Sequence, residues 1–322
     1  MSEVLAFHRS LPGYEPTPLH SLGGVAAGLG LRAVWLKDES DRLGLPAFKV
    51  LGASWAVERL LRERPDVTTL VAASAGNHGR AVARVARLRG LRARILLPAR
   101  ARRVRVEAIA AEGAAVMRVD GGYEAALAAA DAAAAEPGAA LVADVGEDPA
   151  DRVPGWVVEG YSTLFAEVDA QVPEPPDVVL VPAGVGSLAA AAVAWAARRT
   201  PPVRAVAVEP ATAACIGASL AAGRPVTVET PGTTMAGLDC ARPSGAAWPA
   251  LRDGLAGAVA VGDAQAHAAM RELAALGLEI GDCGAAPLAA LRAGGVARPG
   301  ERVLLIGTEG ASDPGAYRAI VG

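Results

Sequence analysis

The stretch Val178-Val179-Leu180-Val181-Pro182-Ala183-Gly184-Val185-Gly186-Ser187-Leu188-Ala189 contains the pattern that decides the fold. Its apolar, β-branched start predicts a buried strand, its two glycines indicate a tight turn, and the alanine-rich run after them predicts a helix. A strand without polar alternation is typical of a parallel sheet that helices cover on both faces. The stretch therefore predicts one strand–turn–helix unit of an α/β protein.

The same alternation recurs along the 322 residues. We predict strands at 33–36, 67–73, 93–97, 114–119, 177–181, 203–208 and 303–306. We predict helices at 53–64, 79–88, 102–112, 123–135, 157–168, 188–197 and 264–276. Strands that alternate with helices in this way indicate a two-lobed, three-layer αβα architecture with parallel sheets.

A break at 145–149 divides the pattern. We expect residues 49–152 to form a smaller α/β domain on the substrate side. Because the amino-terminal segment needs a core to pack against, we expect residues 1–48 to join 153–322 in a larger, cofactor-binding domain.

Composition excludes several classes of function. The net charge is −3 and no basic stripe contains aromatic residues, so we expect no nucleic-acid partner. The chain has neither a signal-peptide pattern nor an apolar run of ~18 residues, so we expect no membrane span and a cytoplasmic location. Cys215, Cys240 and Cys283 are too few and too scattered for a zinc site or a disulfide framework, although the first two could lie close together.

The choice of basic residues is the most unusual feature of the chain. Only Lys37 and Lys49 are lysines among 31 lysines and arginines. An amine can lose its proton and attack a carbonyl, which a guanidinium cannot do. Lys49 follows Leu45-Pro46-Ala47-Phe48, and apolar neighbours lower the pKa of an amine. Lys49 is therefore a candidate nucleophile; the alternative is compositional drift that leaves two surface lysines by chance.

Three glycine-containing turns follow predicted strands, at 74–80, 183–187 and 307–310. Ligands of open α/β sheets bind beyond the carboxyl ends of the strands. Backbone N–H groups at 184–187 would suit a phosphate, and those at 74–79 would suit a carboxylate. The alternatives are a tight turn that needs glycine, and capping of the next helix by Ser74 or Asn77.

Two further side chains stand at strand ends. Thr308 follows the last predicted strand and offers a neutral hydroxyl to a ring nitrogen, unless it is an ordinary strand-end threonine. Asp144 follows Leu141-Val142-Ala143 and is a candidate acid–base group, unless it only initiates a turn. A reactive amine, a phosphate cradle, a carboxylate loop and a hydroxyl are together what pyridoxal phosphate (PLP) requires.

These motifs resemble those of the fold type II (tryptophan synthase β-like) PLP-dependent enzymes, and more narrowly of the diaminopropionate ammonia-lyases. The matching stretches span nearly the whole chain and include 16–20, 35–40, 47–54, 76–80, 153–164, 183–187, 235–240 and 308–314. The resemblance implies a homodimeric lyase that acts on a small amino acid. The favoured substrate is L-2,3-diaminopropionate, which β-elimination converts to pyruvate and ammonia.

The resemblance also implies residue roles. Lys49 would carry the cofactor as a Schiff base, and Asp144 or the released Lys49 would remove the α-proton. The cofactor would bind Asn77 through its phenolic oxygen and Thr308 through its pyridine nitrogen. The substrate carboxylate would bind the loop Ser74, Ala75, Gly76 and His78. The phosphate would bind Gly184, Val185, Gly186 and Ser187. No residue is expected to bind a metal.

One residue departs from this pattern. Similar enzymes that process both enantiomers of diaminopropionate carry an aspartate where this chain has Ala75, and the 74–78 loop is instead typical of serine/threonine dehydratases. An L-serine or L-threonine dehydratase is therefore the first alternative. A PLP-dependent β-replacement synthase is the second, and a non-catalytic amino-acid sensor is the third.

Overall fold

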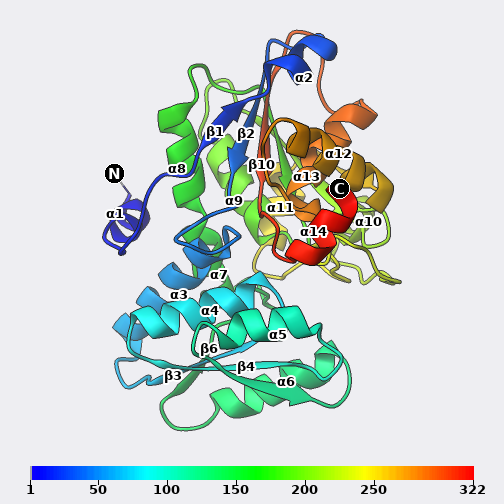
Figure 1. Ribbon diagram of the computed structural model, residues 1–322. Helices are drawn as coiled ribbons and strands as arrows, with labels where there is room; N and C mark the ends of the chain where they lie inside the picture. Colours follow the sequence, from blue (N-terminus) through cyan, green and yellow to red (C-terminus); the bar gives the residue numbers. More distant parts are fainter. Residues whose placement is uncertain (1) are drawn as a thin grey trace. The chain divides into compact units, whose positions relative to one another are not determined.

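The computed structural model describes residues 2–322, which form two compact units. The larger unit consists of residues 2–48, Val145–Asp151 and Tyr161–Gly322, and the smaller consists of Lys49–Asp144 and Arg152–Gly160. Figure 1 shows the elements of both units in sequence colours. Among residues 2–322, no helix has both the length and the apolar character needed to cross a membrane.

The large unit contains a six-stranded sheet with the order β1-β2-β10-β7-β8-β9. Only the edge pair β1–β2 is antiparallel within it. The strands are β1 (Leu19–Ser21), β2 (Ala33–Asp38), β7 (Val178–Pro182), β8 (Arg204–Pro210), β9 (Gly257–Val261) and β10 (Arg302–Gly307). Leu36, Leu180 and Leu305 of adjacent central strands are fully buried, so this sheet is the core of the unit.

Helices cover this sheet. They are α1 (Glu3–Arg9), α2 (Gly23–Gly28), α8 (Ser162–Gln171), α9 (Ser187–Ala196), α10 (Cys215–Ala222), α11 (Trp248–Gly254), α12 (Asp263–Ala275), α13 (Asp282–Ala293) and α14 (Pro314–Val321). Helix α9 is alanine-rich and almost wholly buried, as expected of a helix packed between a sheet and other helices. The quoted stretch forms β7, its turn and α9, in agreement with the sequence analysis.

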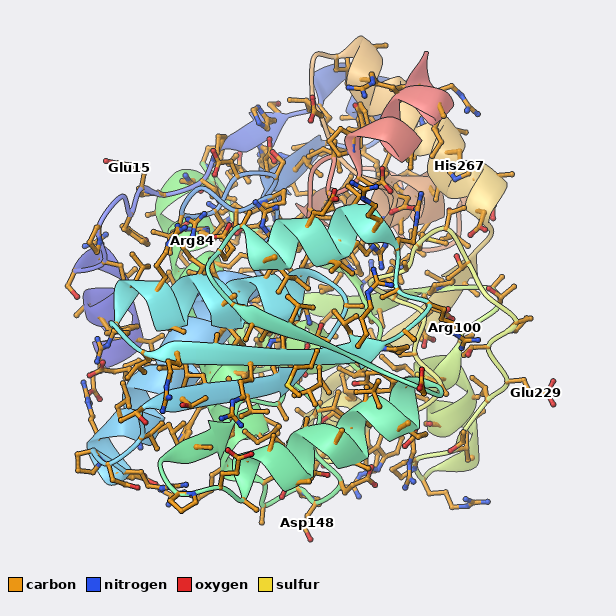
Figure 2. The ribbon with its side chains drawn as sticks, turned by 60° about the horizontal axis from the view of Figure 1, so that its bottom comes forward. Glu15, Arg84, Arg100, Asp148, Glu229 and His267 are labelled. Carbon is orange, nitrogen blue, oxygen red and sulfur yellow. The ribbon has the colours of Figure 1, made fainter. Side chains whose placement is uncertain are left out.

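The small unit has a parallel four-stranded sheet with the order β5-β4-β3-β6. Its strands are β3 (Thr69–Ala73), β4 (Arg92–Pro98), β5 (Ala115–Val119) and β6 (Ala139–Leu141). Its helices are α3 (Lys49–Glu63), α4 (Asn77–Leu88), α5 (Arg103–Ala110), α6 (Tyr123–Ala134) and α7 (Arg152–Gly160). Figure 2 shows α4 and α5 on one side of this sheet and α6 on the other, with Arg84 labelled.

One predicted helix is wrong in its continuity. The range 157–168 forms the end of α7 and the start of α8, which belong to different units. Helix α7 packs against α3: a Cβ on Gly160 would lie 2.6 Å from the Leu51 carbonyl oxygen, and Trp55 donates to Glu159 at 2.7 Å. The seven predicted strands are present, and β1, β6 and β9 were not predicted because they are short or lack a distinctive apolar run.

Candidate active site

Lys49 and Asp144 form an ion pair within the small unit. Lys49 is the first residue of α3, and Asp144 is the third residue after β6. The Lys49 Nζ lies 2.7 Å from Asp144 Oδ2, and the two side chains are 20% and 17% exposed. An amine that is partly accessible and paired with a carboxylate has the geometry of a nucleophile beside an acid–base group. The structure thus brings together two residues that the sequence analysis selected independently.

Asp144 is held in its ionised form. Burial by itself would raise the pKa of Asp144, but the charge that His78 carries when it is protonated, the charge of Lys49 and the hydrogen bond from Lys49 more than offset this effect. The pKa of Asp144 therefore lies well below its ordinary value. An ionised carboxylate can accept a proton, so Asp144 is present in the form that a base requires.

His78 is the third member of this group. It lies in the first turn of α4, is buried, and has its Nδ1 3.8 Å from Asp144 Oδ2. Its other ring nitrogen, Nε2, lies 2.7 Å from the carbonyl oxygen of Val142. The sequence analysis assigned His78 to the substrate loop. In the structure its ring nitrogens are directed at Val142 and Asp144, on the segment that follows β6.

The loop before α4 is tightly packed. The Gly76 N–H donates to Ser74 Oγ at 3.3 Å, and a Cβ on Gly79 would lie 2.3 Å from the Ser74 carbonyl oxygen. Gly76 is the N-cap residue of α4, so neither Ser74 nor Asn77 occupies the capping position that was the alternative for this loop. The first N–H groups of a helix have no partner inside it, so the α4 N-terminus remains suited to a carboxylate.

The turn between β7 and α9 in the large unit is a close-packed backbone cradle. Gly186 has a left-handed conformation with φ of +94°, and a Cβ there would lie 2.5 Å from Leu251 Cδ1. A Cβ on Gly184 would lie 2.8 Å from Cys240 Sγ. Side chains packed behind the turn thus leave no room for a Cβ at either glycine. The backbone N–H groups of the turn and Ser187 lie at the start of α9. This arrangement fits a phosphate group.

Cys215 and Cys240, whose proximity the sequence left open, both lie against this turn. The Cys215 thiol is 3.6 Å from the Gly184 carbonyl oxygen, and Cys240 packs at the Cα of the same glycine. All three cysteines are reduced. Burial, followed by the charges of Glu209 and Cys240, raises the pKa of Cys215 far above its ordinary value, so this thiol stays protonated.

Thr308 stands at the same edge of the large sheet as the 183–187 turn. It follows β10, which is a neighbour of β7 and runs parallel to it. Its side chain is buried, and its Oγ1 has no hydrogen-bond partner among the described residues. A buried hydroxyl without a hydrogen-bond partner destabilises the protein. A ring nitrogen that accepts a hydrogen bond from this hydroxyl would remove that cost. Within the large unit, Thr308 and the 184–187 cradle are therefore candidate contacts for a cofactor with a ring nitrogen and a phosphate.

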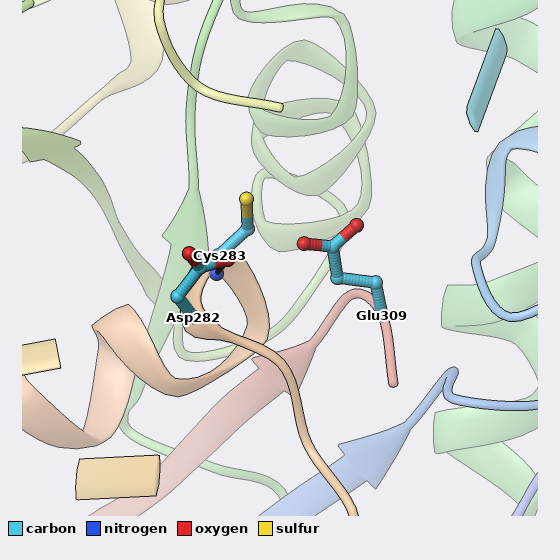
Figure 3. Close-up of side chains that lie close together, drawn as sticks. All are labelled: Asp282, Cys283 and Glu309. Atoms are coloured by element: carbon cyan, nitrogen blue, oxygen red, sulfur yellow. Dashed lines mark hydrogen bonds between the residues drawn. The ribbon is translucent and has the colours of Figure 1, made fainter. Parts of the chain in front are cut away.

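Asp282, Cys283 and Glu309, the residue after Thr308, form a polar cluster (Figure 3). Their ligand atoms lie within 4.8 Å of one another. Burial and the charge of Glu309 raise the pKa of Asp282 to about 6, and burial keeps the Cys283 thiol protonated by raising its pKa well above its ordinary value. The sequence analysis did not identify this cluster, because its members come from α13 and from the segment after β10.

Lys37 is not a surface residue. Its side chain is fully buried, and its Nζ donates to Thr17 O, Glu167 Oε2 and Gln171 Oε1 at 2.7, 2.7 and 2.9 Å. An ammonium has three protons, and three acceptors of the protein take them. The compositional alternative, with two surface lysines, is therefore wrong for Lys37. Its role is structural, and it leaves Lys49 as the candidate nucleophile.

A parallel sheet with a glycine turn at its carboxyl edge, a hydroxyl beside it and a lysine paired with an acid define a fold type II PLP-dependent enzyme. The comparisons agree. The family described as pyridoxal-phosphate dependent enzyme matches residues 11–309. The chain belongs to this family of PLP-dependent enzymes, and the predictions of the fold class and of PLP as the cofactor are confirmed.

Similar proteins narrow the class. A diaminopropionate ammonia-lyase of Salmonella typhimurium is 34% identical over an alignment of 305 positions that covers 85% of this chain and 75% of the relative. A crystal structure of diaminopropionate ammonia-lyase from Escherichia coli, in complex with an aminoacrylate–PLP azomethine reaction intermediate, has a TM-score of 0.90 and 31% identity. That alignment covers 99% of this chain and 90% of the other. A biosynthetic L-threonine dehydratase of Mycobacterium leprae is 35% identical over 227 residues, or 70% of this chain and 51% of the relative.

Proposed function

We propose that this protein is a PLP-dependent ammonia-lyase that eliminates ammonia from L-2,3-diaminopropionate. One substrate molecule and one water would yield one pyruvate and two ammonia molecules. The observation that carries the proposal is the Lys49–Asp144 pair, an amine and an ionised carboxylate 2.7 Å apart. It occurs in a chain that matches diaminopropionate ammonia-lyases over most of its length.

When bound, PLP supplies an aldehyde for the substrate amine and a ring that accepts electrons as the α-proton leaves. Lys49 holds the cofactor until substrate arrives and is then released as an amine. Asp144 accepts the α-proton of the L-isomer, which its low pKa permits because the carboxylate is ionised at neutral pH. The α4 N-terminus and Ser74 orient the substrate carboxylate, and Asn77 binds the cofactor's phenolic oxygen.

The large unit contributes the contacts to the other end of the cofactor. Gly184, Val185, Gly186 and Ser187 hold the phosphate by backbone N–H groups and a hydroxyl. Thr308 donates a hydrogen bond to the pyridine nitrogen. Because the neutral hydroxyl keeps its proton, the nitrogen stays unprotonated, which suits elimination. The Phe48 N–H donates to the Thr308 carbonyl oxygen at 3.3 Å, and Lys49 is the next residue in the chain. This connection supports the assignment of Lys49 and Thr308 to one cofactor.

The test is release of pyruvate and ammonia from L-2,3-diaminopropionate by the PLP-loaded protein. The ratio of the products identifies the leaving group, since diaminopropionate gives two ammonia molecules per keto acid and serine or threonine gives one. The matched control is Lys49→Ala, which removes the amine alone. Keto acid from serine or threonine but none from diaminopropionate would disprove the assigned substrate.

An L-serine or L-threonine dehydratase is the second candidate. It is favoured by the Ser74-Ala75-Gly76-Asn77-His78 loop, which has no acidic residue, and by the similarity to a biosynthetic L-threonine dehydratase. The same assay separates the two candidates when both substrates compete in one mixture. A higher kcat/KM for serine or threonine would select the dehydratase.

A homodimer and a cytoplasmic location remain predictions. A fold of this size with a small-molecule substrate is compatible with both. Light scattering of the PLP-loaded protein measures the first, since a dimer has twice the 32.4 kDa mass of one chain.

A further inference from the structure

His78 has a polar atom that the proposed chemistry does not use. Its Nδ1 is buried and has no hydrogen-bond partner in the described chain, and the nearest acidic atom is Asp144 Oδ2 at 3.8 Å. A backbone carbonyl only accepts hydrogen bonds, so the Nε2 that contacts Val142 O must carry the hydrogen. In the neutral ring, Nδ1 therefore turns a lone pair toward a carboxylate, which leaves two acceptors facing each other.

The third group explains how this arrangement persists. The Lys49 ammonium contacts the same oxygen, Asp144 Oδ2, at 2.7 Å and supplies the positive charge that the carboxylate needs. In the proposed function, Lys49 is bonded to the cofactor for part of the cycle and its ammonium is then withdrawn. A largely buried carboxylate that loses its cation is destabilised. His78 Nδ1 is the nearby group that can replace the lysine.

We propose that His78 is a positioning residue for Asp144, exchanging places with Lys49 as the partner of its carboxylate. When the Lys49 ammonium is withdrawn, the ring takes one proton from solvent at Nδ1, becomes an imidazolium, and donates that N–H to Asp144. Nε2–H stays on the Val142 carbonyl oxygen, so both nitrogens are then donors with partners. A charge-assisted N–H···O bond is ~2.7–2.9 Å long, so the two side chains need to approach by about 1 Å.

Most other charged groups on the elements around His78 form ion pairs of their own. Strand β3 carries no charged residue. The remaining ion pairs of α3, α4, β4 and α5 are Arg62–Glu58, Arg89–Glu58, Arg59–Glu159, Arg152–Glu63, Arg80–Glu112, Arg84–Glu112, Arg87–Glu112, Arg94–Glu136 and Arg103–Glu107. The exchange at His78 therefore involves the Asp144 carboxylate and the Lys49 ammonium.

The first test needs no turnover. The chain has four histidines, so ¹⁵N-histidine NMR of the full-length, PLP-free protein can follow His78, assigned by its loss in His78→Gln. We expect a neutral Nε2–H tautomer in the unaltered protein at neutral pH. In Lys49→Ala, we expect both nitrogens of His78 to be protonated, and in Lys49→Ala/Asp144→Asn the ring should again be neutral. An unchanged His78 spectrum in Lys49→Ala would overturn the proposal.

The second test rests on the proposed function and uses the PLP-loaded enzyme. His78→Gln keeps a donor for the Val142 oxygen and lacks Nδ1, whereas His78→Asn offers a neutral N–H near the Nδ1 position. We expect His78→Gln to lower kcat for L-2,3-diaminopropionate about 10–100-fold, less than loss of the base itself, with KM little changed. His78→Asn should recover part of the loss.

Two measurements distinguish positioning of Asp144 by His78 from a nonspecific loss of structure in the variants. Borohydride trapping of PLP on Lys49 should be retained in both His78 variants, and the acid limb of the kcat–pH profile should change in His78→Gln. Wild-type kcat and an unchanged profile would contradict the positioning role. If the unaltered protein produces no keto acid, the proposed function fails, whereas the NMR result on the PLP-free protein still decides the exchange.

Discussion

The two lysines of this chain occupy opposite kinds of environment. Lys37, on β2 of the large unit, is fully buried, and three protein acceptors take its three protons. Arg42 completes this Lys37 cluster through bonds to Glu39 and Glu167. Lys49, at the start of α3, is one-fifth exposed and shares its carboxylate with a histidine nitrogen that has no partner.

The difference shows how the same residue type serves stability or chemistry. In the Lys37 cluster two cations face two carboxylates, and burial lowers the pKa of Lys37 although Glu39 and Glu167 oppose it. Each proton of the Lys37 ammonium has an acceptor, so removing any one of these hydrogen bonds destabilises the cluster. At Lys49, the ion pair with Asp144 lies beside His78 Nδ1, which has no hydrogen-bond partner among the described residues and can accept a proton. Three acceptors around a fully buried ammonium mark the structural lysine, whereas partial exposure beside an ionised carboxylate marks the reactive one.

The largest effect should come from Lys49. Lys49→Ala should abolish elimination by at least ~10³-fold, because it removes the covalent attachment of the cofactor, and Lys49→Arg should not restore activity. Borohydride reduction followed by peptide mass spectrometry should locate pyridoxyl-lysine at residue 49 of the unaltered protein. Label at Lys37 would reverse the assignment of the two lysines.

Asp144 should have the next largest effect. Asp144→Asn should lower turnover of L-2,3-diaminopropionate by ~10²–10⁴, because it removes a positioned base. The unaltered protein should prefer the L-isomer, since Ala75 has no ionisable group to serve the opposite face, and Ala75→Asp should gain activity on the D-isomer. Equal turnover of both isomers by the unaltered protein would mean that another base acts.

Substitution of Lys37 should change the stability of the fold and not the reaction at Lys49. Lys37→Met should lower the free energy of unfolding by ~3–5 kcal/mol, because it removes one partner of a buried ion pair. Urea unfolding measures this change. The control is Arg32→Met, which breaks the exposed pair with Glu174 and should cost ~0–1 kcal/mol. Equal losses in the two variants would show that burial of the Lys37 cluster contributes nothing.

The smallest expected effect is the change in the free energy of unfolding per pH unit at acid pH, through Glu167. Burial would raise the pKa of Glu167, but Arg42 and Lys37 more than offset it and lower the pKa to about 2. A carboxyl whose pKa is lowered by folding stabilises the protein above its ordinary value of 4.5, and this contribution is lost as the pH falls toward 2. Across this range the loss is ~1 kcal/mol per pH unit. Unfolding free energies at several pH values should show a shallower slope for Glu167→Gln.

Much of the fold could be predicted because its signals are local. The strand at 177–181, the glycine turn and the helix at 188–197 are encoded within one stretch, and a Schiff-base lysine is conspicuous where lysine is otherwise so rare. The split of 157–168 into α7 and α8 could not be predicted, because it depends on Gly160 packing against the Leu51 backbone in another helix. The capping alternative at Ser74 and Asn77 failed for a similar reason, since a close approach of Gly79 to Ser74 sets that turn.

The sequence by itself determined the α/β alternation, the glycine cradle at 184–187 and the identity of two exceptional lysines. Only the tertiary structure decided which lysine is saturated and which is paired with Asp144, 95 residues away. The physical reason is strand register. Parallel pairing of β3 with β6, extended by the Val142 N–H bond to the Val71 carbonyl, brings their carboxyl ends to one edge. Asp144 and His78 meet there, and no local pattern in the sequence records that meeting.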